Sequence, residues 1–298
     1  MRSWTLVSVS VSRAVKVGRG LPTRRRLPSA VRTPVTVIAI SVILLWMIAA
    51  VLAPWVTPRG PMAQDLRARM AAPSLTHWFG TDQLGRDVLS RVVYGARLSI
   101  PIGLMAVALA TLLGVSVGAT AGYFGGLVDE IPMRIIDLFL AFPGVILAMV
   151  ITAALGPGTR NAVIAITAAW WPTYARFSRG LVLSLRDREY VQAARGLGAS
   201  TGRVLMRHVL PGTISPLTIL GTLDVGRAML TFASLSFLGL GPSAGTPEWG
   251  AMVAAGRNHF DEWWISAFPG LAILTCVLSI NIVGDSLRDL LDPRFRTT

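Results

Sequence analysis

The chain is built from long apolar segments that are separated by polar ones. Each apolar segment is about as long as a helix needs to cross the hydrocarbon core of a bilayer, roughly 20 residues. This pattern predicts an all-α membrane protein with six transmembrane helices. The predicted spans are Val35–Ala53, Leu98–Ala121, Ile135–Leu155, Asn161 to about Leu183, Ile214–Leu238 and Ile265–Ser286. Pro143 lies within the third span and is expected to kink it.

The composition agrees with this pattern. Of the 298 residues, 53% are hydrophobic and only 14% are charged, and the mean hydropathy is +0.59. Soluble globular domains carry about 25% charged residues. The net charge of +13 would fit a nucleic-acid partner, but the basic residues gather beside the apolar segments, where membrane topology explains them. We therefore predict a protein surrounded by membrane lipid, with no nucleic-acid partner.

The charges between the spans predict the orientation of the chain. Residues 1–33 hold eight basic residues and no acidic one, and positive charge favours the cytoplasmic side. With six spans, both termini are then cytoplasmic, and so is the polar loop 186–212. The loops 57–97 and 239–264 lie outside. The 57–97 loop is net positive, which conflicts with the rule, although a long loop crosses despite its charge when the first helix is strongly oriented.

Five parts follow from these boundaries. Residues 1–33 are predicted to form a basic cytoplasmic tail, 34–56 the first transmembrane helix, 57–97 an extracytoplasmic loop, 98–288 the core transmembrane domain and 289–298 a cytoplasmic tail. The first apolar run is too long, starts too late and lacks the small-residue cleavage site of a signal peptide. The basic tail is open to three interpretations: a disordered tail, an amphipathic surface helix or an upstream start-codon artefact. We favour a tail without a function of its own.

The residue types that catalysis and metal binding require are sparse. Cys276 is the only cysteine and lies in an apolar run, and His77, His208 and His259 are scattered without ligand spacing. No Gly-x-x-x-x-Gly-Lys-Ser/Thr loop for phosphate binding occurs. No Gly-x-Ser-x-Gly motif with a histidine in a span occurs either, which argues against an intramembrane enzyme. The sequence therefore predicts no catalytic residue, no metal site and no cofactor in this chain.

A polar, arginine-rich stretch, Glu189–Pro211, lies between two apolar spans and reads EYVQAARGLGASTGRVLMRHVLP. Gly198 is expected to end a first helix, because glycine tolerates a positive φ. Ser200 or Thr201 then caps a second helix, which Pro211 stops. Two helices of about two turns each are marginal on their own. This favours an element that docks on another protein over an ordinary basic loop.

The first of these helices is expected to present a face to that partner. Helical spacing places Tyr190, Ala194 and Leu197 on one side, with Val191 beside them. The small pair Ala193–Ala194 would permit a close approach of the partner surface.

This stretch resembles the EAA loop of ABC-importer permeases. The resemblance rests on Gln192-Ala193-Ala194, on Gly198 four residues later, and on Leu210-Pro211. In that family the loop forms coupling helices that dock in a cleft of the ATPase subunit. The resemblance therefore implies ATPase-coupling roles for Glu189, Gln192, Ala193, Ala194, Arg195, Gly198, Leu210 and Pro211. Gln192 departs from the family motif, which has Glu there, so docking is expected to rest on shape and packing more than on one salt bridge.

Further stretches resemble, in the same order, the C-type permease subunit of dipeptide, oligopeptide and nickel importers. They are His77–Ile100, Ser234–Gly241, Pro247–Gly250, Phe268–Gly270 and Asn281–Arg294. Together with the EAA loop, the resemblance covers roughly residues 35–296. A departure is Phe232, where this subfamily commonly has Glu.

The resemblance implies a type I ABC importer permease fold with cytoplasmic coupling helices, in a bacterial cytoplasmic membrane. It implies a homologous B-type permease subunit, two ATP-binding subunits that hold ATP and Mg, and an extracytoplasmic substrate-binding protein. The substrate would be a dipeptide or oligopeptide, and nickel-chelate and glutathione importers are alternatives that share these motifs. A secondary transporter is a further alternative. It would be expected to carry titratable residues on several spans and an inverted repeat, whereas here only Asp137 and Asp224 stand out and no clear repeat is seen.

Asp224 and Arg227 lie inside the fifth apolar segment at i,i+3 spacing, close enough to pair. Charges within a span are costly unless they pair or face water or protein. The two residues are therefore candidates for lining a translocation path. The alternative is a structural ion pair that faces the helix bundle, or a segment that begins in the cytoplasmic interface.

The extracytoplasmic loop carries opposite charges at i,i+4 spacing, Asp82 with Arg86 and Asp87 with Arg91. Asp82, Arg86 and Asp87 are candidates for contact with a substrate-binding protein, and so is Trp249 in the 239–264 loop. The alternatives are a self-paired solvated loop for the charges and an interfacial anchor for the tryptophan.

Overall fold

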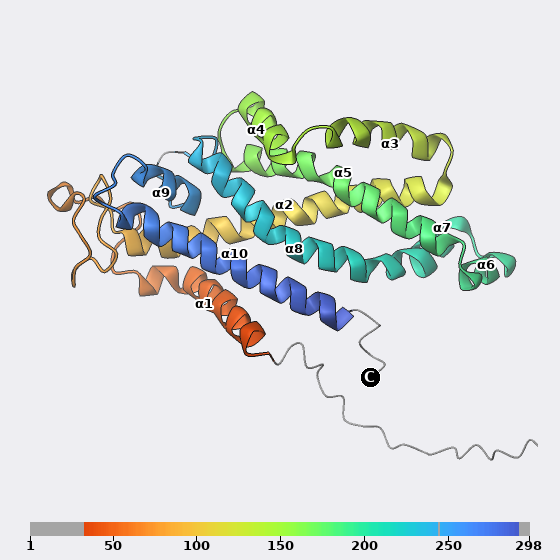
Figure 1. Ribbon diagram of the computed structural model, residues 1–298, viewed down its shortest axis with the longest axis horizontal. Helices are drawn as coiled ribbons and strands as arrows, with labels where there is room; N and C mark the ends of the chain where they lie inside the picture. Colours follow the sequence, from red (N-terminus) through yellow and green to blue (C-terminus); the bar gives the residue numbers. More distant parts are fainter. Residues whose placement is uncertain (1–32, 244, 292–298) are drawn as a thin grey trace, which may run out of the picture.

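The computed structural model describes residues 33–243 and 245–291, and in this part of the chain every regular element is a helix (Figure 1). In chain order these are α1 (Pro34–Val56), η2 (Leu66–Ala68), α2 (Val88–Phe124), α3 (Leu127–Leu140), α4 (Gly144–Leu155), α5 (Thr159–Arg186), α6 (Glu189–Gly196), α7 (Thr201–Val204), the π-helical turn η3 (Leu205–Val209), α8 (Leu210–Phe237), α9 (Trp249–Gly256) and α10 (Trp264–Leu291). The predicted all-α class is confirmed. The basic tail up to residue 32 and the C-terminal tail from residue 292 lie outside the described residues.

Four of these helical stretches are long and apolar enough to cross a membrane. They are α1, α2, the continuous stretch Thr201–Phe237 and α10, and the bent pair α3–α4 makes a fifth when it is counted as one span. α5 has 28 residues, which is long enough, but its arginines and Asn161 make it less apolar than the others. The chain is therefore a multi-pass membrane protein.

The third predicted span is not one straight helix. α3 and α4 meet at 91°, and Pro143 is the N-cap of α4, with φ −58° and ψ 125°. Proline lacks the N–H that would continue the α3 ladder, and it pushes the preceding residue out of the helical region. The expected kink at Pro143 is confirmed, and it is a sharp break.

The second predicted span also differs in its start. α2 begins at Val88, ahead of the predicted Leu98, so the preceding loop is shorter than 57–97. The first turns of α2 contain Arg91 and Arg97, and an apolar pattern alone does not include them. The Asp87 side chain accepts a hydrogen bond from the Ser90 amide over 2.8 Å, which is the capping contact that fixes the start.

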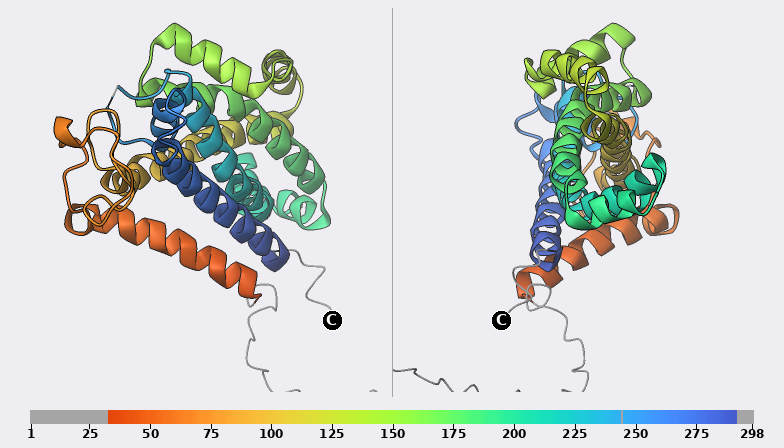
Figure 2. Two further views of the ribbon diagram at one scale, coloured as in Figure 1. Left: turned by 60° about the vertical axis from the view of Figure 1, so that its left-hand side comes forward. Right: turned by 90° about the vertical axis from the view of Figure 1, so that its right-hand side faces the viewer.

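The connections gather at the two ends of the helix bundle (Figure 1). The 57–87 loop and α9 lie at one end, where the Trp264 indole donates to the Thr81 carbonyl over 3.1 Å. The stretch α6–α7 lies at the other end, and a further view along the bundle shows it there as well (Figure 2). α2 and α5 run the length of the bundle between these two ends.

The two central helices, α2 and α5, approach each other closely because α2 carries glycines on the facing side. A Cβ atom on Gly114 would lie 2.4 Å from the Cβ of Tyr174, and one on Gly118 would lie 2.0 Å from the Ala175 carbonyl oxygen. Small residues at such interfaces let helix backbones pack in direct contact, which is the main source of helix association in lipid. α2 and α5 therefore pack backbone against backbone.

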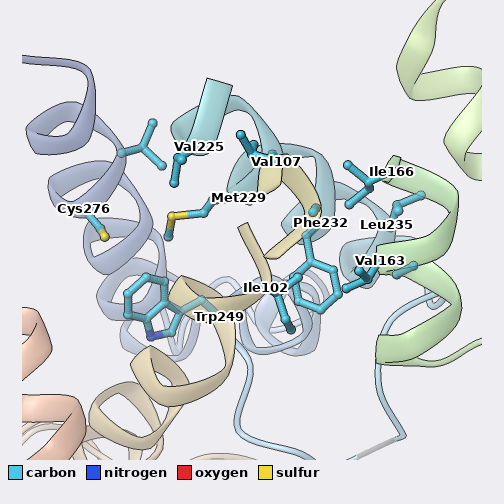
Figure 3. Packing of buried hydrophobic residues seen from close by; sticks show 14 of the residues in the cluster. Ile102, Val107, Val163, Ile166, Val225, Met229, Phe232, Leu235, Trp249 and Cys276 are labelled. Atoms are coloured by element: carbon cyan, nitrogen blue, oxygen red, sulfur yellow. The ribbon is translucent and has the colours of Figure 1, made fainter. Parts of the chain in front are cut away.

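The main hydrophobic core lies around α8. Figure 3 shows side chains that converge there from α2, α5, α8, α9 and α10. Met229 and Phe232 of α8 are buried within it, as is Cys276 of α10. Phe232 is 1% exposed, so this departure from the subfamily motif fills the core.

Candidate functional site

The polar segment, Glu189–Pro211, forms the helix–glycine–helix arrangement that its sequence predicts. Gly198 follows α6 with φ +84°. The amides of Leu197 and Ala199 donate to the carbonyl oxygens of Ala193 and Ala194 over 3.0 and 3.1 Å. These bonds satisfy the last carbonyls of α6, as in other glycine-terminated helices. Gly198 therefore sets the angle between α6 and α7.

The second half of the polar segment differs from its prediction. Pro211 does not stop a helix; it lies in the first turn of α8, and α7, η3 and α8 continue as one stretch. Inside a continuous helix a proline removes one backbone hydrogen bond, which the helix accommodates by a local irregularity. The ladder widens to the π-helical turn η3 just before Pro211. Tyr190 reaches across from α6 and donates its hydroxyl to the His208 carbonyl over 3.3 Å.

A second hydrophobic core holds the polar segment on the bundle. Its buried members are Ala119 of α2, Val182 of α5, Val191 of α6, Val204 of α7, and Leu205 and Val209 of η3. The Arg195 guanidinium also lies 5.3 Å from the ring centre of Tyr123 at the end of α2, within the range of a cation–π contact. The polar segment is therefore packed against the ends of α2 and α5, and does not hang free as a loop.

The surface that α6 leaves exposed is partly apolar. Leu197 is 89% exposed, and Tyr190 and Met206 are exposed as well. The predicted face needs a correction, because Ala194 and Val191 pack inward on the second core while Tyr190 and Leu197 point outward. Of the alanine pair only Ala193 is exposed, next to Glu189, Gln192 and Arg195.

Gln192, the departure from the EAA motif, has a partner within this chain. Its Nε2 atom donates to the Asp187 carbonyl over 3.0 Å. The bond spans the turn between α5 and α6, where a carboxylate could not donate. Gln192 therefore helps to fix the orientation of α6.

Asp224 and Arg227 form the predicted ion pair, and Tyr174 joins them. Arg227 Nη1 donates to Asp224 Oδ1 over 3.1 Å, and the Tyr174 hydroxyl donates to Asp224 Oδ2 over 2.9 Å. The Arg227 guanidinium lies 5.6 Å from the ring centre of Trp170. Asp224 is 4% exposed, whereas the Arg227 side chain is 72% exposed. We call these four residues the Asp224 cluster.

The Asp224 cluster borders a cavity of about 160 Å³ that is lined by α3, α4, α5 and α8. Other ion pairs lie between α3 and α5. Arg179 Nε is 2.5 Å from Asp129 Oδ1, and Arg176 pairs with Asp137 through partly exposed side chains. Charged groups between apolar helices need water or protein around them. Ionisable groups therefore link α3 to α5 and α5 to α8 in this part of the bundle.

The four candidates for binding-protein contact are buried, which corrects that prediction. Asp82, Arg86, Asp87 and Trp249 are all less than 9% exposed. Asp82 accepts from Arg86 Nε over 2.7 Å, as predicted, but Arg91 approaches Asp82 at 3.5 Å and does not pair with Asp87. Asp87 caps α2 instead and lies 3.2 Å from His77 Nδ1. These charges hold the loop together and present no surface to a partner.

Trp249 is likewise part of the interior. Its Nε1 donates to the Val92 carbonyl over 2.8 Å, and its ring meets the Trp46 ring edge-to-face with centroids 5.0 Å apart. The preceding residue, Glu248, is fully buried and accepts hydrogen bonds from the Gly250 and Ala251 amides over 2.9 and 2.8 Å. Burial raises the pKa of Glu248, although these amides favour its ionised form.

Sequence analysis missed two polar residues of these sites, Tyr174 and Glu248. Tyr174 is 50 positions from its partner Asp224, so no local spacing links them. Glu248 did carry a weak signal, because negative charge is favoured at the N-terminus of a helix.

An all-helical chain with several apolar spans, ion pairs between its helices and a polar segment packed on one end of the bundle is typical of polytopic membrane transport proteins. Residues 110–297 match the sequence family described as binding-protein-dependent transport system inner membrane component. The chain belongs to this family.

Named relatives cover most of this chain. The dipeptide transport system permease protein DppC of Alkalihalophilus pseudofirmus is 39% identical over 277 residues, which are 93% of this chain and 91% of the relative. The nickel transport system permease protein NikC of Escherichia coli K12 is 42% identical over 261 residues, 87% and 94% of the two chains. The di/tripeptide transport system permease protein DppC of Pseudomonas aeruginosa is 43% identical over 260 residues, 85% and 86%.

Proposed function

We propose that this chain is the C-type permease subunit of an ATP-driven importer of dipeptides or oligopeptides. The observation that carries the proposal is the polar segment, which is packed on the ends of α2 and α5 and exposes Leu197 and Tyr190. Leu197, Met206 and Tyr190 are all exposed on this one short segment, and a group of exposed apolar side chains fits a surface that another protein covers. The membership in the transport family supplies the context.

The direction of the helices supports six crossings. α2 ends beside the polar segment, where Arg186 donates to the Gly122 carbonyl over 3.0 Å. α5 begins at the opposite end, where the Gly158 amide donates to the Leu240 carbonyl over 3.3 Å. The bent pair α3–α4 connects these two ends and therefore runs across the bundle. With α5, which also runs from end to end, the count rises from four to six, as in a type I importer permease.

Coupling would follow from this geometry. Two cytosolic ATPase subunits would bind ATP and Mg. α6 and α7 would be the coupling helices, which dock in a cleft of an ATPase subunit, and Gly198 would set the angle between α6 and α7. A partner can shift a conformational equilibrium only through contacts that differ between the two conformations. Because the second core ties α6 to α2 and α5, movement of α6 would tilt these helices together. The chain itself would be non-catalytic.

The polar segment would then face the cytoplasm, as would both termini, and the 57–87 loop and α9 would face the substrate-binding protein. The exposed Arg227 and the adjoining cavity would line the translocation path against a homologous B-type permease. Exposed charge within a span is stable only against water or protein, and a path between two subunits supplies both.

Peptides are the proposed substrates because two of the relatives carry di- or tripeptide transport in their names. A nickel-chelate importer is the second candidate, since NikC is 42% identical to this chain. A glutathione importer remains a third.

The proposal is tested by affinity purification of this chain from native membranes. We expect a second permease, two ATP-binding subunits and an extracytoplasmic binding protein to co-purify. The reconstituted complex should take up labelled dipeptide only with ATP. Recovery of this chain alone, or ATP-independent uptake, would contradict the proposed assembly. A binding protein that retains nickel and no peptide would assign the second candidate.

A further inference from the structure

The Asp224 cluster contains one charged group whose binding capacity is largely unused. Asp224 is 4% exposed, and each of its carboxylate oxygens already accepts a hydrogen bond, one from Arg227 and one from Tyr174. Arg227 gives Nη1 to this contact, whereas a guanidinium carries five N–H donors in a planar fork. Its side chain is 72% exposed. Asp224 therefore fixes the arginine in place and leaves most of the fork available.

The surroundings of Arg227 favour a planar, anionic ligand. The guanidinium is held near the Trp170 ring, which restricts its orientation. The adjoining cavity of about 160 Å³ has aromatic walls, Phe139 and Phe142, and lies at the break between α3 and α4. A carboxylate is planar and accepts two parallel hydrogen bonds from an arginine fork. A cation would meet the exposed Arg227 first, since Asp224 behind it is only 4% exposed.

We propose that Arg227 is a binding site for the carboxylate of a passing substrate, such as the C-terminal carboxylate of a short peptide. The inference rests on the proposed importer function and adds the chemical group that the path recognises. The ion pair with Asp224 is nearly neutral at a distance, so the attraction is short-range and the substrate is released again. Weak, local binding of this kind is what a conducting path requires.

A purely structural ion pair is the competing explanation, and it makes a different prediction. A structural pair needs only the contact between the two side chains, and it gives no role to the rest of the Arg227 guanidinium, whose side chain is 72% exposed. If Arg227 served only to neutralise Asp224, its removal would alter stability. It would not change how the cavity discriminates between anionic and cationic ligands.

The pocket can be probed with a single introduced thiol, because Cys276 is the only cysteine in the sequence. Thr173 is exposed and lines the cavity. In a Cys276→Ser, Thr173→Cys chain, reconstituted with its co-purifying subunits, we would measure labelling rates with an anionic and a cationic methanethiosulfonate reagent. Arg227→Gln is expected to lower the anionic-to-cationic rate ratio about tenfold, since one nearby charge changes a local concentration by about that much. Arg227→Lys should preserve the ratio.

The matched control removes an arginine from α5, the helix that carries Thr173. Arg160 is exposed at the start of α5, about 20 Å from Thr173 at 1.5 Å per residue, which is beyond the screening length in salt. Arg160→Gln should leave the rate ratio unchanged. In the Cys276→Ser, Thr173→Cys chain that keeps Arg227, millimolar alanyl-alanine should slow labelling of the thiol. The C-terminal amide of the same dipeptide should not.

Three results would overturn the carboxylate site: an unchanged rate ratio in Arg227→Gln, equal protection by the peptide and its amide, or a thiol that neither reagent reaches. ATP-driven uptake by the same reconstituted complex separates the two proposals. If the complex takes up peptide but the labelling of Thr173→Cys does not depend on the charge of the reagent, the carboxylate site is refuted and the importer function is not. A complex with neither ATPase activity nor uptake refutes the importer itself.

Discussion

Arg186 Nη1 donates a 3.0 Å hydrogen bond to the Gly122 carbonyl oxygen and so joins the last turn of α5 to the last turn of α2. The second core lies at the same place, with Ala119 from α2 and Val182 from α5. α6 begins at Glu189, directly after this junction. A displacement of α6 therefore acts on two central helices at once, and not on one flexible connection.

Gly198 is predicted to be essential for this transmission. Proline cannot adopt the φ of +84° that Gly198 has, because its ring fixes φ near −65°. Gly198→Pro should abolish ATP-driven uptake while the subunit still inserts and assembles in the membrane. Gly198→Ala should cost about 1 kcal/mol at this left-handed position and keep part of the uptake. Wild-type uptake by the proline variant would refute the role of the α6–α7 angle.

The contact between α2 and α5 should depend on Gly118. A Cβ atom there would lie 2.0 Å from the Ala175 carbonyl oxygen, so Gly118→Ala must force the helices apart. We expect a loss of about 1–3 kcal/mol in the free energy of unfolding. Gly180→Ala on α5 is the control, because its Cβ would meet nothing within 4 Å, and a helical alanine is favoured over glycine by up to about 1 kcal/mol. Equal effects in a denaturation series would contradict the close packing.

Val191 and Leu197 test the inner and outer faces of the polar segment separately. Val191 is buried in the second core, so Val191→Ala should lower the thermal stability of the purified subunit. Leu197 is 89% exposed, so Leu197→Ala should leave stability unchanged. It should instead weaken binding of the ATPase subunit by about tenfold, as expected for losing about 1.5 kcal/mol of apolar burial. Unchanged ATPase affinity in a pull-down titration would show that Leu197 lies outside the interface.

Glu248 should make stability depend on pH. Burial raises its pKa in the folded protein, so the folded state holds the proton more tightly than the unfolded state. This contribution is fully present below the unfolded value of about 4.3 and is lost as the pH rises through the raised folded pKa. Glu248→Gln cannot titrate. The unfolding free energy of the wild type, relative to this variant, should therefore fall as the pH rises from about 4, and a flat difference would contradict the shift.

The sequence predicts the helices well because lipid requires long apolar runs, and the predicted spans fall on helix apart from the break at residues 141–143 in the third and the last residue of the fifth. It predicts the position of the break at Pro143, but not its angle of 91°, which depends on packing of α3 and α4 against α5. Pro211 shows the opposite case. A helix stop is the usual local expectation, yet the position falls in the first turn of α8 and the helix continues.

Side-chain partners were harder to predict, since local spacing covers only one helix at a time. The i,i+4 rule found Asp82–Arg86 but assigned Arg91 to the wrong carboxylate. Asp87 is occupied as the N-cap of α2, so Arg91 turns to Asp82. The Tyr174 contact with Asp224 joins α5 to α8, and it follows from the fold alone.

The most direct test of the central claim is a photo-crosslink from the exposed face of α6 to the ATPase. In the Cys276→Ser background, a benzophenone maleimide placed on Leu197→Cys should crosslink to an ATP-binding subunit of the complex in native membranes. Leu75 is 95% exposed in the loop at the opposite end of the bundle. The same label on Leu75→Cys should give no crosslink to the ATPase. Crosslinking to the ATPase from position 75, or none from position 197 in an assembled complex, would contradict the coupling role of this helix.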